Sequence, residues 1–353
     1  APGAGAGAAK PAPSWARAEI ATVVAAGLLA PDVTSVRPDE PLTQGELAEL
    51  ASGLARLGPA RLGLARLGQA TAIDRDTGID RATPEAPERA TTLAELDARL
   101  VRVLGLQDAA AAFAAGARAA GLKPPDRFGT EAVARLLGLR TNHPAALDAL
   151  ELRPNDPVTR AEAAFSAARI LRLDGARIES VRAAAATFVL PALEPRQRMI
   201  LGRAFSFVGF PYVWGGESER RAGPFGPQPQ GGFDCSGFVW RVYKLERYPG
   251  AEALADTLKG RTTYAMSGEV GRAERIAFAQ LRPGDVAFFG ARGPRSRPAE
   301  VDHMGIYAGG GWLVHSSRDG TTVTPLAGWY RERFAWGRRP LAEAGIDAAD
   351  PLR

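Results

Sequence analysis

Apolar residues recur at helical spacing through the first half of the chain, which is rich in alanine, leucine and arginine. The stretch Trp15–Leu29 has this spacing and ends near a glycine, which indicates a first helix. A second helix is expected to begin at Thr43, because Thr43 followed three residues later by Glu46 forms a capping box. The pattern therefore predicts a helical region over residues 15–172.

The sequence around that capping box returns later in the chain. Leu152–Phe165 repeats the arginine-proline segment and the Thr-x-x-Glu box, with Thr159 as the capping residue and Glu162 as its partner. Weaker echoes occur at Thr92–Leu96 and Gly129–Val133. An internal repeat of this kind is typical of a modular helical array, in which each unit packs on its neighbours.

The pattern changes after Pro195, where glycine and aromatic residues become frequent and strand signals appear. Arg196–Val208 is predicted as a helix, Val286–Phe289 as a strand, and Val301–Ser317 as two strands separated by three glycines, which is a hairpin signal. A mixture of helices and antiparallel strands predicts an α+β domain. The expected division of the chain is a flexible linker at 1–14, the helical region at 15–172, a linker at 173–194, the α+β domain at 195–340 and a tail at 341–353.

Two of the three histidines lie in the predicted hairpin. If the turn centres on Gly309, His303 and His315 are equally far from it and face each other across the two strands. Directly opposed side chains have Cβ atoms about 4.5–5.5 Å apart. Alternation then places the apolar residues of both strands on the opposite face, as core. These residues are Met304, Ile306, Trp312 and Val314.

The only cysteine, Cys235, stands between small residues and is followed by an apolar run. This arrangement predicts a tight loop that delivers the thiol to the first turn of a buried helix, where free N–H groups favour the thiolate. With one histidine as base and a second polar group to orient it, the set suits a thiol hydrolase. A buried structural cysteine is one alternative. A metal site made by Cys235, His303 and His315 is another, although the chain lacks CxxC and HxxxH spacing.

Composition narrows the classes of partner. The chain has 353 residues, 46% of them hydrophobic, and a formal net charge of +5. It has no uncharged apolar run of membrane-spanning length and no basic helix interleaved with aromatics, so neither a membrane span nor nucleic-acid binding is expected. The small-residue N-terminus without methionine resembles a mature end left after signal removal, which predicts a secreted protein. No cofactor is expected.

The helical unit consists of an aromatic-led helix, a Gly-Leu turn, an Arg-Pro segment and a Thr-x-x-Glu box, and it resembles the S-layer homology repeat. The resemblance is clear at 13–57 and 143–172. It implies pseudo-threefold helical modules that anchor exported proteins to anionic cell-wall polymers. In that family a basic residue after the capping threonine helps to hold the polymer; Arg160 matches it, whereas the first copy has Gln44. A purely structural helical region is the alternative.

Five motifs in the second half occur in the order and approximate spacing of NlpC-type cell-wall cysteine peptidases. They are Tyr212–Gly216, Phe233–Phe238, Arg282–Asp285, Asp302–Tyr307 and Val314–Ser316. This resemblance covers about residues 200–340 and implies a papain-like α+β fold. It also implies hydrolysis of amide bonds in peptidoglycan stem peptides, usually between D-glutamate and the following diamino acid.

The resemblance also implies roles for single residues. Cys235 matches the nucleophile, His303 the general base and His315 the residue that orients it. Tyr212 matches a tyrosine beside the nucleophile, and Asp234 and Ser236 match positions that line the site for the free amine of the peptide. Asp234 as a helix N-cap and Tyr212 as a packed aromatic are the alternatives.

Two segments depart from the family pattern, the insert 217–231 and the basic loop 290–300. Both are expected to flank the cleft, where they would narrow the choice of substrate or cover the cleft. Two alternative functions therefore stay open. One is a cell-wall-anchored binding or structural protein with an occluded catalytic domain, and the other is a related amidase or acyltransferase.

Overall fold

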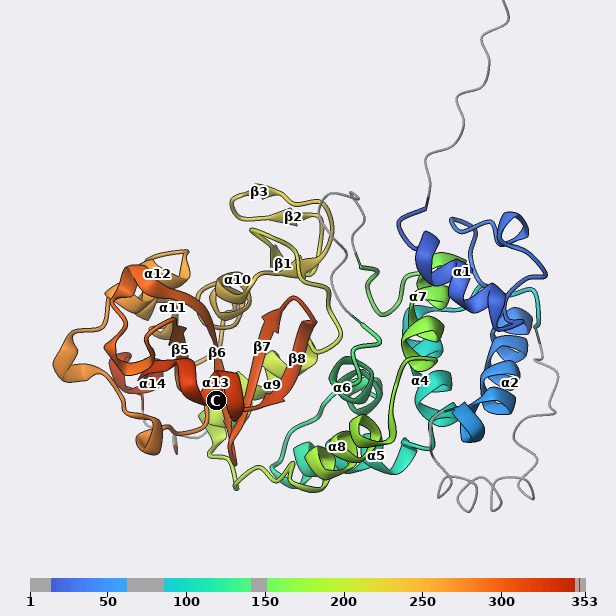
Figure 1. Cartoon of the computed structure of the whole chain (residues 1–353). Helices are drawn as coiled ribbons and strands as arrows, with labels where there is room; N and C mark the ends of the chain where they lie inside the picture. Colours follow the sequence, from blue (N-terminus) through green and yellow to red (C-terminus); the bar gives the residue numbers. More distant parts are fainter. Residues whose placement is uncertain (1–13, 62–85, 141–150, 347–348, 350–353) are drawn as a thin grey trace, which may run out of the picture.

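The computed structural model describes residues 14–61, 86–140, 151–346 and 349 (Figure 1). It confirms a helical N-terminal half and an α+β C-terminal half. The predicted linker 1–14 lies almost wholly outside the described residues, as do His143 and part of the predicted tail. The helices of the first half are α1 (Arg17–Ala25), η1 (Val33–Ser35), α2 (Gln44–Arg61), α4 (Leu93–Val103), α5 (Gln107–Ala119), α6 (Phe128–Leu136), α7 (Arg160–Ile170) and α8 (Gly175–Ala186).

Three extended segments interlock at the centre of the helical half, each just before a helix. The N–H of Leu42 donates to the carbonyl of Val158, that of Val158 to Thr91, and that of Thr91 to Leu42, each at 2.8 Å. These three hydrogen bonds close a ring, so the segments are related by a pseudo-threefold axis. The S-layer homology resemblance implied this symmetry.

The ring shows which echoes of the repeat are structural. Thr43, Thr92 and Thr159 follow the three ring segments and cap α2, α4 and α7. The Thr92 echo therefore shares the ring segment and the capping box with the other two copies. The echo at Gly129–Val133 is wrong, because α6 begins at Phe128 and its N-cap residue makes no side-chain capping bond. In this stretch Glu131 follows Thr130 directly, so the Thr-x-x-Glu spacing of the other copies is absent.

An antiparallel five-stranded sheet organises the C-terminal half, with strand order β8-β7-β6-β5-β9. The strands are β5 (Val286–Gly290), β6 (Val301–Gly309), β7 (Trp312–Ser317), β8 (Gly320–Pro325) and β9 (Phe334–Arg338). The helix α10 (Cys235–Trp240) packs against β6 and β7. The other elements are α9 (Pro195–Ser206), β1 (Glu217–Ser218), β2 (Ala222–Gly223), β3 (Gly226–Pro227), β4 (Gly232–Phe233), η3 (Arg241–Leu245), α11 (Leu254–Thr257), α12 (Thr263–Gly268), η4 (Arg272–Glu274), η5 (Phe278–Gln280), η6 (Gly293–Arg295), η7 (Pro298–Glu300), α13 (Gly328–Arg333) and α14 (Pro340–Glu343).

The register of the β6–β7 hairpin differs from the prediction by two residues. Ile306 pairs with Val314, so the turn centres on Gly310 and not on Gly309. A Cβ on Gly305 would lie 2.7 Å from that of His315, which places His315 opposite Gly305 and diagonal to His303. A shift of two keeps each side chain on its face. The two histidines therefore still share one face, and Met304, Ile306, Trp312 and Val314 are buried in the core as predicted.

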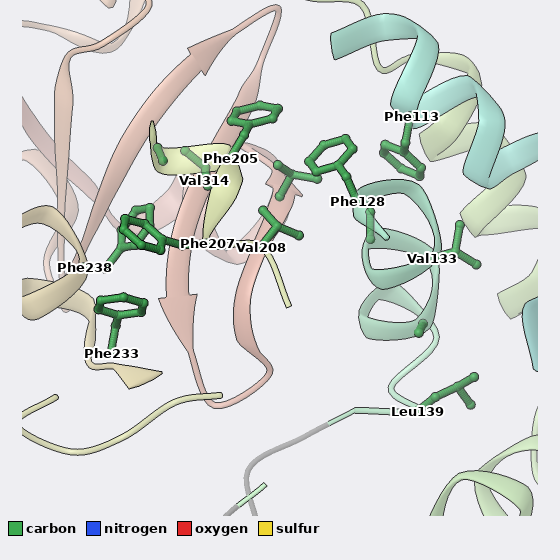
Figure 2. Close-up of a cluster of buried hydrophobic side chains, with 14 of the residues drawn as sticks. Phe113, Phe128, Val133, Leu139, Phe205, Phe207, Val208, Phe233, Phe238 and Val314 are labelled. Atoms are coloured by element: carbon green, nitrogen blue, oxygen red, sulfur yellow. The ribbon is translucent and has the colours of Figure 1, made fainter. Parts of the chain in front are cut away.

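Aromatic side chains join the two halves into one hydrophobic core. The rings of Phe113 on α5 and Phe188 after α8 lie 5.6 and 4.9 Å from the ring of Trp312 on β7. Phe128 on α6 stacks on Phe205 of α9 at 5.0 Å. Figure 2 shows Phe113 and Phe128 from the helical half beside Phe205 and Val314 from the other half. The helical half therefore packs directly on the sheet.

A buried arginine reinforces this contact. Arg135 on α6 donates to the backbone carbonyls of Gly209 and Asp319, which lie in the C-terminal half. Within the helical half it pairs with Glu131 and Glu151. The guanidinium thus spans the boundary between the halves. Figure 1 shows α6, which carries Arg135, beside β8.

In the described part of the chain, no single helix has the length and hydropathy of a membrane span. One pair passes jointly, α4 with α5, and it bends by 120° at its break.

Candidate active site

Cys235 is the first residue of α10, directly after β4, as the sequence predicted. Asp234 is the N-cap, and its Oδ1 accepts from the N–H of Gly237 at 2.5 Å and from the hydroxyl of Ser236 at 2.9 Å. A Cβ on Gly237 would lie 1.9 Å from the carbonyl oxygen of Gly216, so only glycine allows this close approach. The small residues therefore let the loop 215–216 pass over the start of the helix.

Cys235 is buried, with 8% of the residue exposed. Burial, followed by the negative charge of Asp234, raises its pKa to about 11, although hydrogen bonds to Thr263 and to the backbone of Ser236 and Met304 oppose the shift. The prediction that the helix start favours the thiolate is therefore wrong. The helix α10 has only six residues, and desolvation of the sulfur outweighs its partial positive charge. The resting group at neutral pH is the thiol.

The two histidines form a direct hydrogen bond. Nε2 of His303 lies 2.9 Å from Nδ1 of His315, and the imidazole planes are 84° apart. Burial lowers the pKa of His303 to about 4 and that of His315 well below its usual value. Both imidazoles are therefore neutral at pH 7, and each is available as a proton acceptor or donor according to its tautomer.

The sulfur lies next to the strand that carries His303. The helix α10 packs on β6, and the backbone of Met304, the residue after His303, hydrogen-bonds to the sulfur of Cys235. The hydroxyl of Thr263 on α12 lies 3.7 Å from the sulfur on another side. Within the described residues Nδ1 of His303 has no hydrogen-bond partner. Cys235 and His303 thus lie on two elements that pack on each other, and a neutral thiol and a neutral imidazole with a free ring nitrogen are the groups that general-base activation requires.

Two aromatic rings hold the imidazoles in place. The ring of Tyr330 on α13 lies 5.1 Å from His315 and 5.9 Å from His303. The ring of Phe289 on β5 lies 5.8 Å from His303 on another side. Neither residue was predicted from the sequence. Phe289 reaches the histidines because β5 pairs with β6. Tyr330 reaches them because the chain returns to the site after β8.

Tyr212 lies close to the nucleophile. It forms a bridge to Phe233, two residues before Cys235, and it is partly buried. Burial is the main cause that raises the pKa of its hydroxyl, followed by the negative charge that Cys235 carries once ionised and by that of Asp234, so the hydroxyl stays protonated. The hydroxyl can therefore serve as a hydrogen-bond donor beside the sulfur.

Asp234 and Ser236 take part in an ionic network that the sequence did not reveal. Nη1 of Arg261 lies 2.8 Å from Oγ of Ser236 and 3.2 Å from Oδ1 of Asp234. Nε of Arg261 donates to Glu217 at 3.0 Å. The alternative reading of Asp234 as an N-cap is thus confirmed, since one carboxylate oxygen caps α10. Arg261 lay in a stretch without a recognised motif, and Glu217 is the first residue of the insert.

The insert 217–231 folds as two short antiparallel pairs, β1 with β4 and β2 with β3. The side-chain amide of Gln228 ties it together, because it donates to the carbonyls of Ser218, Gln230 and Gly232. In the loop 290–300, Arg292 and Arg297 both pair with Glu300. Both extra segments are therefore ordered parts of the domain.

Arg160, the candidate polymer-binding residue, is engaged within the protein. Its guanidinium lies 2.6 Å from Glu46 and 2.7 Å from Glu40. Gln44, at the matching position of the first copy, hydrogen-bonds to Glu95 at 3.2 Å. At this position both side chains link one repeat to another. No group of three or more histidine, cysteine or acidic side chains in the described ranges could hold a metal ion.

Comparison with protein families identifies two regions. Residues 209–339 match the NlpC/P60 family, and residues 9–48 match the S-layer homology domain. Among known proteins, "Probable endopeptidase YafL" of Escherichia coli (strain K12) is 34% identical over 142 residues, which is 39% of this chain and 48% of that protein. "Murein DD-endopeptidase MepH" of the same strain is 31% identical over 144 residues, 40% of this chain and 45% of that protein.

A third relative is "Gamma-D-glutamyl-L-lysine dipeptidyl-peptidase" of Bacillus subtilis (strain 168), 28% identical over 120 residues, 34% of this chain and 32% of that protein. The match spans less than half of each of these relatives. Among solved structures, an NlpC/P60 family protein from Bacillus cereus ATCC 10987 is 26% identical with a TM-score of 0.31, covering 43% of this chain and 42% of that chain.

Proposed function

The C-terminal half of this chain contains an NlpC/P60 domain and the N-terminal half an S-layer homology domain, and from that premise we propose that the protein is a cell-wall cysteine endopeptidase. Its substrates are the stem peptides of peptidoglycan, and the bond cleaved is the amide between D-glutamate and the following diamino acid. The relative named as a γ-D-glutamyl-L-lysine peptidase supports this choice of bond.

The observation that carries the proposal is the bond between His303 and His315 beside the buried thiol. In the first step Nδ1 of His303 takes the thiol proton of Cys235 while the sulfur attacks the amide carbonyl carbon. His315 accepts the Nε2–H of the imidazolium that forms. N–H groups at the start of α10 and the hydroxyl of Tyr212 stabilise the negative charge on the carbonyl oxygen.

Collapse of the tetrahedral intermediate breaks the carbon–nitrogen bond, and the imidazolium gives its proton to the leaving amine. A thioester to Cys235 remains. Water then attacks that carbonyl, again with His303 as base, and the thiol leaves with the proton that His303 returns. No proton or electron is gained or lost over the cycle, so this route needs no cofactor.

The ionic network around Asp234 fits the free amine of a stem peptide. Two carboxylates, Asp234 and Glu217, share one guanidinium, Arg261. The group therefore carries a net negative charge next to the nucleophile, which favours an ammonium group. Ser236 adds a hydroxyl to the same site. Substrates with a free N-terminal amine close to the scissile bond would be preferred.

The proposed location is the cell surface of the producing organism, after export. The S-layer homology domain supports attachment to an anionic wall polymer, which would hold the catalytic half near its substrate. The internal pairs of Arg160 do not favour it as the main polymer contact.

One observation favours the alternative of an occluded or regulated wall-binding protein, namely the 8% exposure of Cys235. A second alternative is an amidase or acyltransferase that uses the same thiol chemistry. The first alternative predicts binding of peptidoglycan without turnover, and the second predicts products with a different new end group.

Three variants test the assigned roles on purified peptidoglycan. Cys235→Ala and His303→Ala are expected to abolish release of soluble peptides while the circular-dichroism spectrum is retained. His315→Ala is expected to reduce the rate without necessarily abolishing it. Continued release by Cys235→Ala would rule out the thiol mechanism, and a wild-type rate for His315→Ala would show that its orienting role is wrong.

A further inference from the structure

The hydrogen-bonded pair of histidines continues to a third residue. Nε2 of His315 lies 3.0 Å from Oγ1 of Thr324 on β8. In the β7–β8 register His315 pairs with Thr322, so Thr324 is its diagonal neighbour on the same face. The result is a linear chain from Thr324 through His315 to His303. Of these three hydrogen-bonded residues, only the two histidines were predicted from the sequence.

Only two proton arrangements satisfy this chain when both imidazoles are neutral. In the first, His303 donates its Nε2–H to Nδ1 of His315, and His315 donates its Nε2–H to Thr324. In the second, every bond runs the other way, and the threonine hydroxyl donates to His315. A hydroxyl can do either, whereas each neutral imidazole has one donor and one acceptor.

The two arrangements differ in the protonation of Nδ1 of His303, the ring nitrogen that has no hydrogen-bond partner in the described residues. In the first, Nδ1 of His303 carries a lone pair and can accept a proton. In the second, Nδ1 already carries a proton and cannot act as a base. After proton transfer His303 has both N–H groups, and its Nε2–H needs an acceptor on His315. Only in the first arrangement is Nδ1 of His315 free to accept this bond. In that arrangement His315 is protonated at Nε2, and its Nε2–H in turn needs an acceptor.

We propose that Thr324 is a positioning residue that holds the histidine pair in the first arrangement by accepting the Nε2–H of His315. His315 is fully buried, so solvent does not supply this acceptor in place of the hydroxyl. Thr324 therefore acts on Cys235 through two imidazoles without touching the substrate. The inference rests on the proposed function, since the base role of His303 gives the arrangement its consequence.

The variant Thr324→Val tests the proposal, because valine keeps the shape and removes the acceptor. The buried Nε2–H of His315 would then lack a partner, which favours the second arrangement. We expect kcat on a soluble stem-peptide substrate to fall about ten- to a hundredfold with KM unchanged. Thr324→Ser keeps the hydroxyl and should stay within about threefold of the wild type, by the same reasoning.

Thr321→Val is the matched control on the same strand. Its hydroxyl is buried and has no hydrogen-bond partner in the described residues, so its loss should leave kcat unchanged. A general effect of valine in β8 would slow this control as well. Equal loss of kcat in Thr321→Val and Thr324→Val, or no loss in Thr324→Val, would overturn the proposal.

A second readout does not depend on turnover. The ¹⁵N chemical shifts of the imidazoles in the Cys235→Ala background report which ring nitrogen carries each proton. We expect His315 to be protonated at Nε2 when Thr324 is present and at Nδ1 in Thr324→Val. Protonation of His315 at Nδ1 with Thr324 present would overturn the proposal even if Thr324→Val fails to fold. Absence of turnover in the wild type would instead count against the proposed function.

Discussion

Alkylation of Cys235 by iodoacetamide tests the protonation state of the resting site. Alkylation requires the thiolate, and a pKa of about 11 leaves roughly one molecule in ten thousand ionised at pH 7. An ordinary cysteine at the reference value of 9.0 has roughly one in a hundred. We therefore expect Cys235 to react about a hundredfold more slowly than an unfolded reference, and the rate to rise about tenfold per pH unit from 7 to 10.

The variant Asp234→Asn tests the second cause of the shift, the negative charge beside the sulfur. Asparagine can still cap α10, but it removes the negative charge beside the sulfur. Arg261 then keeps only one of its two carboxylate partners, Glu217. The pKa of Cys235 should fall, so alkylation at pH 7 should become faster. Because the chain has a single cysteine, intact mass follows the reaction directly, and the urea-unfolded protein supplies the reference. A rate that is constant between pH 6 and 9 would indicate a preformed thiolate–imidazolium pair and refute this reasoning.

Three further predictions concern the helical half and its junction. Burial raises the pKa of Glu131 from 4.5 to about 7, so its ionisation weakens folding as pH rises through that range. Glu131→Gln should therefore keep roughly 3 kcal/mol that the wild type loses between pH 4.5 and 8 in urea titrations. The pKa of Glu95 is lowered, so Glu95→Gln should remove stability that is present above pH 4.5 and is lost only as pH falls below that value. An unchanged slope in Glu131→Gln would contradict the assignment. Trp312→Ala should cost about 3–5 kcal/mol and lower a single thermal transition shared by both halves; two separate transitions in the wild type would show that the halves fold independently. Arg160→Gln should cost about 1 kcal/mol yet leave sedimentation with purified cell walls unchanged, and loss of sedimentation would make Arg160 a polymer contact.

Local sequence signals predicted the elements of the site well. Threonine caps located the helices α2 and α7, and three glycines located the hairpin that carries His303 and His315. Small residues around Cys235 predicted the loop that leads into α10. In each case the cause lies within a few residues of its effect, as in the close approach of Gly237 to Gly216.

Features that depend on pairing between distant strands could not be predicted in the same way. The hairpin turn centres one residue later than expected, which shifts the strand pairing by two residues. Because this shift is an even number, both histidines stay on the same face of the sheet. Thr324 and Tyr330 reach His315 through the β7–β8 register and the following helix. Arg261 meets Asp234 from 27 residues away in sequence. None of these contacts leaves a periodic or motif-like signal.

The protonation state of Cys235 also required the three-dimensional arrangement. The sequence showed a helix start, which favours the thiolate, but it did not show how completely the sulfur is removed from water. The same burial keeps His303 neutral. Burial therefore favours the uncharged form of both groups, and under the proposed mechanism charge develops only when substrate is attacked.

The most direct test of the central claim is mass spectrometry of the soluble products from purified peptidoglycan. If Cys235 cleaves the proposed bond, the wild type releases fragments whose new N-terminus is the diamino acid and whose partner ends in D-glutamate, and Cys235→Ala releases none. Cleavage at the sugar–peptide amide, or the same fragments from Cys235→Ala, would contradict it.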